Sequence, residues 1–175
     1  MKMQNIAISG LLACGVAFAG TTLAGTPSAS MLANSCAGCH GTNGSSVGPA
    51  SPTIAGISVD YFIETMEAYQ DGSRPSTIMT RIAKGYTEEE VKLMANYFAK
   101  QPFVRKPQQH DAQLAKQGAK LHKKYCEKCH EDGGRSSEDD AGILAGQWSP
   151  YVRYTMADFL DGSRSMEKKM KKKLN

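Results

Sequence analysis

Apolar residues recur with helical spacing in several short segments of this chain, and loops rich in Gly, Ser and Pro separate these segments. Residues 58–70 and 112–125 each place apolar side chains three or four positions apart, as one face of a helix requires. Residues 87–100 do the same, and Thr87 and Glu90 open this segment as a capping box. No segment alternates apolar and polar residues well enough to predict a strand. The pattern therefore predicts an all-α protein.

An internal repeat divides the chain. Residues 54–74 read IAGISVDYFIETMEAYQDGSR and residues 144–164 read LAGQWSPYVRYTMADFLDGSR, with nine identities at an offset of 90 positions. One unit has been duplicated, and two units predict two small domains side by side rather than a solenoid. The prolines and polar residues of 101–111 mark the junction, which gives domains at 26–103 and 104–175.

The two copies also carry matching helix boundaries. Ser58 is a suitable N-cap for the helix of the first copy. Ser149, followed by Pro150 at the first helical position, predicts the start of its twin. Gly72 and Gly162 predict where the two helices end.

Residues 1–24 have the pattern of a secretory signal peptide. Lys2 supplies the positive charge, an apolar stretch follows, and small residues precede a cleavage site after Ala24. A membrane anchor is one alternative, although the apolar stretch is short, and Cys14 leaves a lipoprotein signal as another. No later segment is long and apolar enough to span a bilayer, so we expect the mature protein in the periplasm.

Composition narrows the function classes. Hydrophobic residues make up 41% of the 175 residues, which argues against a disordered chain or a multi-span membrane protein. The formal net charge is +4, and a Lys-rich run, KKMKKK, lies near the C-terminus without interleaved aromatic residues. We therefore do not expect nucleic acid as a partner. Domains this small bury little apolar surface, so a disulfide, a metal or a large ligand is expected to support them.

Two short motifs indicate that this ligand is haem. Residues 36–40 read CAGCH and residues 126–130 read CEKCH, again 90 positions apart. Cys-x-x-Cys-His is the attachment signature of c-type haem, in which both thiols bond to the haem vinyl groups and the adjacent His ligates the iron. The motifs predict two covalently bound haem c groups, attached through Cys36, Cys39, Cys126 and Cys129, with His40 and His130 as iron ligands.

Other uses of paired cysteines fit this pattern less well. A zinc site usually has its two Cys pairs about 15–20 residues apart, much closer than the two motifs here. Disulfides are common in exported proteins, and a redox dithiol usually follows a strand and opens a helix. The His that directly follows both pairs favours haem over each of these alternatives.

A second axial ligand is expected downstream of each motif, and Met is the typical choice in an electron carrier because its thioether raises the reduction potential. Met79 is the candidate in the first domain, because Met66 and Met94 lie in apolar helix stripes, where Met usually packs. Met166 is preferred in the second domain because a helical turn follows it. Met170, four residues later, stays an alternative on the same helix face.

Several residues are candidates for supporting roles around the haem groups. A haem-ligating His normally donates its other ring proton to a carbonyl, and the Pro49 carbonyl is expected to accept it from His40. His110 and His122 have no partner pattern, and we expect both to face solvent. Aromatic and arginine side chains are candidates for haem propionate contacts, with ordinary packing or solvent exposure as the alternative: Tyr61, Tyr151, Trp148, Arg74 and Arg164.

From about Met31 to Leu174 the chain resembles the dihaem cytochrome c subunit of flavocytochrome c sulfide dehydrogenase. The segments that carry the resemblance are NSCAGCHGTNGSSVGPASPTIAG, STIMTRIAKGY, GAKLHKKYCEKCH, ILAGQWSPY and MEKKM. The resemblance implies that His40 and Met79 ligate one haem and that His130 and Met166 ligate the other. It also implies a heterodimer with an FAD-containing subunit that oxidises sulfide, and electron transfer to a soluble acceptor such as a small cytochrome c.

The sequence departs from that family after Met166. Family members continue through a closing helix that this sequence does not show, so we expect a second domain that lacks one wall of its haem pocket. Two other functions stay open. One is a free-standing dihaem electron carrier to a terminal oxidase. The other is a haem enzyme such as a dihaem peroxidase, which needs an open iron position and is disfavoured by the two Met candidates.

Overall fold

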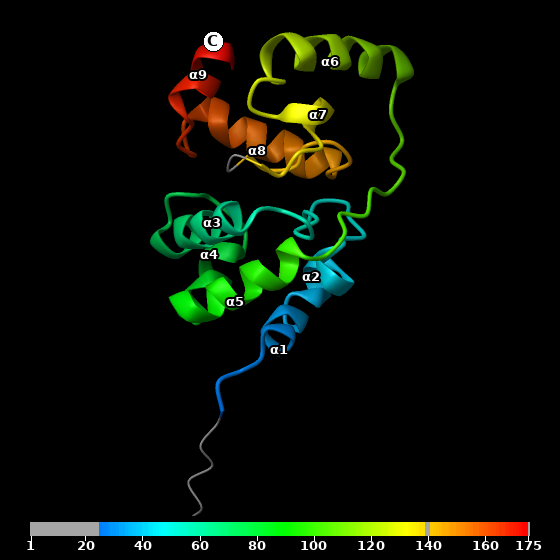
Figure 1. Ribbon diagram of the computed structural model, residues 1–175. Coiled ribbons are helices and arrows are strands. Elements are labelled where there is room, and N and C mark those ends of the chain that lie inside the picture. The colour runs from blue at the N-terminus through cyan, green and yellow to red at the C-terminus, as the bar shows by residue number, and fades with distance from the viewer. Residues whose placement is uncertain (1–24, 139–140, 175) are drawn as a thin grey trace, which may run out of the picture.

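A computed structural model describes residues 25–138 and 141–174, and all regular structure in these residues is helical. The prediction of an all-α fold is confirmed, whereas the predicted signal peptide, residues 1–24, lies outside the described residues. None of the described helices is long and apolar enough to cross a membrane. Figure 1 shows the helices in two groups, α1 to α5 and α6 to α9, joined by an extended segment. We call these groups the first and the second domain.

The first domain contains five short helices and two single 3₁₀ turns. Ser58 accepts a hydrogen bond from the backbone N–H of Tyr61 at the start of α3, and Gly72 follows its last residue with a φ of 82°. Both hydrogen bonds of the Thr87–Glu90 capping box form at the start of α5. These local predictions are confirmed. The helices are α1 (Ala29–Asn34), α2 (Ala37–His40), α3 (Val59–Asp71), α4 (Met79–Ile82) and α5 (Glu88–Ala99), with the turns at Thr42–Gly44 and Ala83–Gly85.

The second domain repeats the first part of this order. Its helices are α6 (Ala112–Tyr125), α7 (Glu131–Gly134), α8 (Ser149–Asp161) and α9 (Lys168–Leu174). Helix α8 begins one residue earlier than predicted, with Trp148 rather than Ser149 at the N-cap and no side-chain cap. Pro150 explains this, because it fixes a helical φ without needing a capped N–H. The Ser149 hydroxyl donates instead to the side-chain oxygen of Gln108, 3.0 Å away.

The repeat extends to the backbone hydrogen bonds. The carbonyl of Gly44 accepts bonds from the N–H groups of residues 54–55, and the carbonyl of Gly134 accepts bonds from residues 144–145. Each atom in the second set lies 90 positions after its counterpart. The duplicated sequence therefore folds into duplicated turns around both Cys-x-x-Cys-His motifs.

The apolar core lies almost entirely in the first domain, where α1 and α3 both pack against α5. The ring of Phe62 on α3 stacks on that of Phe98 on α5, with 5.6 Å between the ring centroids. Among the described residues, Ile143 is the second domain's one contribution to this core. The buried cluster consists of Leu32, Ala33, Ile57, Phe62, Met66, Ala83, Val91, Met94, Ala95, Phe98 and Ile143.

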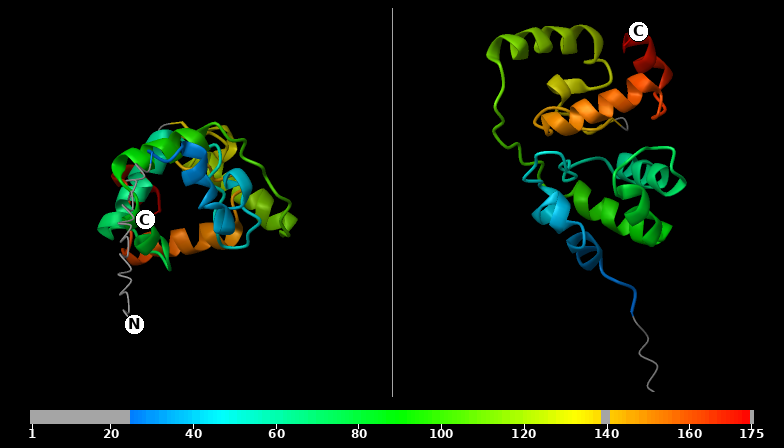
Figure 2. Two further views of the ribbon diagram at one scale, coloured as in Figure 1. Left: turned by 90° about the horizontal axis from the view of Figure 1, so that it is seen from below. Right: turned by 180° about the vertical axis from the view of Figure 1, so that it is seen from behind.

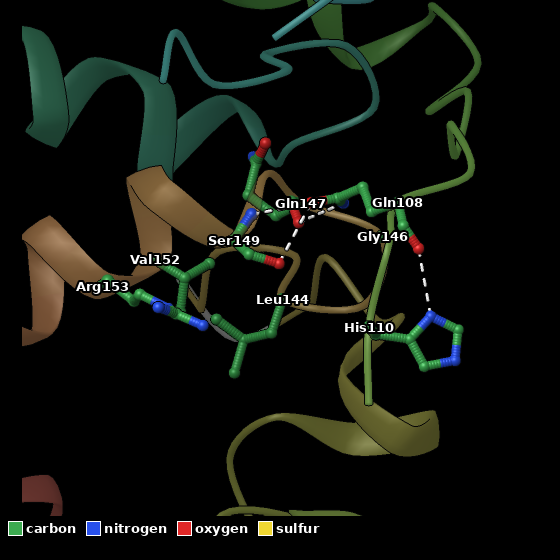
Figure 3. A pocket seen from close by; sticks show the side chains of 8 residues that line it. All are labelled: Gln108, His110, Leu144, Gly146, Gln147, Ser149, Val152 and Arg153. Carbon is green, nitrogen blue, oxygen red and sulfur yellow. Dashed lines mark hydrogen bonds between the residues drawn. The ribbon is translucent and has the colours of Figure 1, made fainter. Parts of the chain in front are cut away.

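The described part of the second domain has no counterpart of α5. Helices α6, α8 and α9 bury no residue, and Leu114 on α6 is 65% exposed. A cavity of about 410 Å³ lies beside the start of α8 (Figure 3). Its lining residues Gly146 and Val152 correspond to Gly56 and Phe62, both of which contact Phe98 of α5 in the first domain. The cavity therefore occupies the place where a closing helix packs in the first domain.

The two domains face each other in the right view of Figure 2, and loops and helix α8 make contacts between them. The indole of Trp148 packs directly against the backbone of Gly48, whose φ is 77°. A Cβ at position 48 would lie 2.7 Å from the indole, so both the backbone conformation and this contact require Gly. The second domain is thus seated on the loop that follows α2.

Candidate functional site

The first Cys-x-x-Cys-His motif forms one helical turn. Cys36 is the N-cap of α2, and its carbonyl accepts hydrogen bonds from the N–H of Cys39 at 3.2 Å and the N–H of His40 at 2.9 Å. Both thiols are unpaired, and the thiol of Cys39 is exposed. The turn therefore presents both sulfurs and the imidazole from a single rigid segment.

His40 is 8% exposed, and its Nδ1 lies 2.8 Å from the carbonyl oxygen of Pro52. The prediction that Pro49 supplies this carbonyl is wrong. Ser46 closes the intervening loop, donating to the Ser51 carbonyl and accepting from the Gly48 N–H, and the chain returns to His40 only at Pro52. Burial lowers the pKa of His40, partly offset by the Pro52 carbonyl, so the ring is neutral and its Nε2 is available as a metal ligand.

The second motif has the same turn. The carbonyl of Cys126 accepts from the N–H of Cys129 at 3.1 Å and of His130 at 2.9 Å, and both thiols are again unpaired. The Nδ1 of His130 is buried without a hydrogen-bond partner. Gly142 lies 90 positions after Pro52, and its carbonyl partly offsets the lowering of the His130 pKa by burial. Burial lowers the pKa of His130, and the neighbouring His122 lowers it further.

His110 is exposed, as predicted, but the prediction that His122 faces solvent is wrong. The side chain of His122 is 20% exposed, and its Nδ1 lies 2.9 Å from a carboxylate oxygen of Glu127. Its Nε2 is buried without a partner. The spacing of apolar residues on α6 could not predict the contact between His122 and Glu127, because Glu127 lies in the turn that follows the helix.

The methionines fall into two groups, those that pack in the core and those that are candidates for iron ligands. Met66 and Met94 are buried in the core at 6% and 0% exposure, which agrees with the packing role expected for them. Met79 begins α4, and its half-buried side chain packs against the same cluster as Cys36. Met166 lies in the segment between α8 and α9, whereas Met170 lies within α9, and both are half-buried.

An arginine and several tyrosines meet between the domains. Arg74 is 5% exposed and donates to the Thr65 hydroxyl at 2.9 Å and to the Tyr151 hydroxyl at 2.7 Å. Its guanidinium lies over the ring of Tyr69, 5.0 Å from the centroid. Although burial lowers the pKa of Arg74, the tyrosines raise it more strongly, so the group stays charged.

Within the described residues no carboxylate pairs with Arg74. A buried cation without an anionic partner is costly, so an anionic group beside Arg74 would satisfy the site. The repeat places Arg164 at the equivalent position, over the ring of Phe159 at 4.2 Å. The two arginines therefore mark equivalent positions in the two domains.

The residues present fit a covalently held haem. Burial raises the pKa of the first thiol in each motif, Cys36 and Cys126, whereas redox-active dithiols have a lowered pKa. No three metal-binding side chains converge in residues 25–138 and 141–174, which argues against zinc shared by the two pairs. A large apolar group with carboxylates would supply both the missing core of the second domain and the missing anion beside Arg74. The cavity in Figure 3 is a separate feature, because no residue of either motif lines it.

A duplicated helical module with Cys-x-x-Cys-His in each copy defines the class of c-type cytochromes. Comparison with known proteins agrees. A family model described as Cytochrome c matches residues 28–101. The cytochrome subunit of sulfide dehydrogenase from Chlorobaculum tepidum is 45% identical over 96 residues, which is 50% of this chain and 86% of that protein. The chain belongs to the cytochrome c family, and it is an electron-transfer protein that carries covalently bound haem c.

Two further comparisons extend across both domains. Cytochrome c4 from Pseudomonas aeruginosa is 29% identical over 177 residues, which is 93% of this chain and 85% of that protein. The crystal structure of reduced cytochrome c4 from Pseudomonas stutzeri superposes with a TM-score of 0.70 at 24% identity, covering 83% of this chain and 87% of that one. The predicted fold of two tandem cytochrome c domains is therefore confirmed.

Replacing the buried arginine tests whether it pairs with an anionic group. We expect Arg74→Met in the haem-loaded protein to lower the free energy of unfolding by about 3 kcal/mol, because it removes one partner of a buried charge pair. Chemical denaturation followed by circular dichroism measures this. Arg81→Met is the control, because Arg81 is exposed and donates only to the carbonyl of Thr77. Equal effects of the two substitutions would contradict the pairing.

Proposed function

We propose that this chain is a periplasmic dihaem cytochrome c subunit that accepts electrons from an FAD-containing sulfide dehydrogenase subunit. Its two domains, 26–103 and 104–175, hold one haem each, and the signal peptide of residues 1–24 directs export. Electrons leave to a soluble acceptor such as a small cytochrome c. The observation that carries the proposal is the repeated turn, with two free thiols and a His in each copy, of which His40 is buried and His130 half-buried.

The proposed ligands follow from the placement of the side chains. The thiols of Cys36 and Cys39 attach the first haem, and those of Cys126 and Cys129 attach the second. His40 ligates iron through Nε2, since its Nδ1 is turned toward the carbonyl of Pro52, and His130 is proposed to ligate iron in the same way by the repeat. When bound, each haem supplies a one-electron Fe(III)/Fe(II) couple.

The remaining axial ligands and the propionate contacts are proposed from the positions of two methionines and two arginines. Met79 is proposed for the first haem because it begins α4 beside the cluster that Cys36 contacts. Met166 is proposed for the second because it lies outside α9, in the segment that follows α8. Arg74 and Arg164 provide cationic side chains for haem propionates, supported by the absence of a described carboxylate beside Arg74.

The flavoprotein partner is supported by the similarity to a protein named as the cytochrome subunit of sulfide dehydrogenase. A second candidate function is a free-standing carrier of electrons to a terminal oxidase. It is supported by the similarity to cytochrome c4, which extends over 93% of this chain. The electron-transfer role of the chain is the same in both.

Intact mass tests the haem content. The exported protein should weigh as much as the polypeptide from residue 25 onward plus two haem groups. The double substitution Cys36→Ala/Cys39→Ala should remove one haem mass, and Cys126→Ala/Cys129→Ala should remove the other. A mature wild-type protein with the mass of the polypeptide alone would overturn the proposal.

Methionine substitutions test the axial ligands. Oxidised haem with a Met ligand shows a weak sulfur-to-iron charge-transfer band at the red end of the spectrum. Met79→Ala and Met166→Ala should each remove the contribution of one haem to this band, because each removes one sulfur ligand. Met170→Ala is the matched control and should leave the band unchanged. Loss of the band in Met170→Ala, with Met166→Ala unaffected, would reverse the assignment in the second domain.

Purification from the native source separates the two candidate functions. A sulfide dehydrogenase subunit should co-purify with a larger flavoprotein and show flavin absorbance in proportion to haem. The mixture should reduce its haem when sulfide is added under anaerobic conditions. Quantitative recovery of the cytochrome alone, without flavin, would favour the free-standing carrier.

A further inference from the structure

Gln147 of the second domain reaches into the first domain and binds its backbone. The side chain is 7% exposed, although it is a polar amide. Its Oε1 accepts a hydrogen bond from the N–H of Thr53, and its Nε2 donates to the carbonyl of Thr53, both at 2.9 Å. The amide therefore satisfies a complete backbone donor–acceptor pair of the other domain.

The bound N–H belongs to the same peptide unit that orients His40. The carbonyl of Pro52 and the N–H of Thr53 are the two polar groups of one peptide bond, which is planar and rigid. The carbonyl side lies 2.8 Å from Nδ1 of His40, and the N–H side donates to Gln147. A change in the position of the Gln147 amide therefore turns the group that His40 bonds.

The two hydrogen bonds also reinforce each other. Donation from the Thr53 N–H to Gln147 polarises the peptide and makes the Pro52 carbonyl a better acceptor. A better acceptor at Nδ1 raises the basicity of a metal-ligating His. Gln147 thus acts on both the orientation and the electron-donating strength of the imidazole.

The backbone at Gln147 is itself held in place. Nε2 of Gln108, in the segment between the domains, donates to the backbone carbonyl of Gln147 at 2.9 Å, and its Oε1 accepts from the N–H of Ser149 at 2.9 Å. Figure 3 shows Gln108, Gln147 and Ser149 together beside the cavity. The connecting segment thereby positions the residue that reaches into the first domain.

The first domain does not make the equivalent contact with the second domain. The position equivalent to Gln147 in the first domain is Ile57, which is 7% exposed and part of the apolar core. The equivalent imidazole, His130, has no hydrogen-bond partner at Nδ1. The coupling therefore runs from the second domain to the histidine of the first domain only.

We propose that Gln147 is a positioning residue that acts across the domain interface on His40, so that docking of the second domain sets the properties of the first haem. This inference rests on the proposed role of His40 as an iron ligand. It assigns the domain interface a part in tuning one haem selectively, beyond joining the two modules.

The test compares Gln147→Met with Gln108→Met in the haem-loaded, full-length protein. Gln147→Met keeps the side-chain length and removes both bonds to Thr53. Gln108→Met disturbs the same junction without touching Thr53. The readouts are the reduction potentials of the two haems and the proton resonance of each ligand His Nδ1–H in the reduced protein. Loss of one haem in Cys36→Ala/Cys39→Ala assigns the first-haem signals.

Gln147→Met should raise the potential of the first haem, shift its Nδ1–H resonance and speed the exchange of that proton with solvent. The second-haem signals should stay in place. Gln108→Met removes the bond to the backbone of Gln147 but keeps the Gln147 amide, so it should shift the first-haem signals less than Gln147→Met does. Gln147→Glu, which keeps an acceptor for the Thr53 N–H, should shift the Nδ1–H resonance less than Gln147→Met. Unchanged first-haem signals in folded Gln147→Met, or equal shifts in Gln108→Met, would overturn the inference. A wild-type protein whose first haem shows no His Nδ1–H resonance would instead overturn the proposed function.

Discussion

The described part of the second domain buries little apolar surface of its own, and its contacts with the first domain hold it in place. Among its described residues, Ile143 alone is a buried apolar side chain, and it packs into the core of the first domain. One support is the docking of loop residues 147–148 on the first domain. In the proposed holoprotein, a haem attached at the second motif adds apolar surface to the same domain.

Both Cys-x-x-Cys-His motifs lie in short turns next to loops. Each Cys-x-x-Cys-His turn is short enough to be fixed by two backbone hydrogen bonds to the first cysteine. A covalent ligand then needs no deep pocket, because two thiols and one imidazole from a single turn already fix its edge. Arg74 lies buried between Thr65 and Tyr151 near the domain interface, where the proposed function assigns it to a haem propionate. Duplication brings two of these sites into one chain, which suits the transfer of single electrons.

The duplication is not a symmetric one in its details. His40 has a hydrogen-bond partner at Nδ1, while His130 has none. Gln147 replaces the apolar side chain found at the matching position, Ile57, and binds the other domain instead of packing in its own core. Two copies of one module can thereby give their cofactors different environments. These two differences lie in single side chains, while the backbone hydrogen bonds of the motif turns are repeated.

The sequence by itself determined the helical class, the duplication, the thiol pairs with their histidines, and the caps at Ser58 and Thr87, because each depends on residues close together in the chain. The tertiary structure decided the features that depend on residues far apart in the sequence. It replaced Pro49 by Pro52 as the partner of His40, since Ser46 closes the loop between them. It also buried Nε2 of His122 and brought Gln147 to Thr53, 94 positions apart. The spacing of apolar residues in the sequence shows which face of a helix is apolar. Only the packing of the two domains decides which polar group lies against that face.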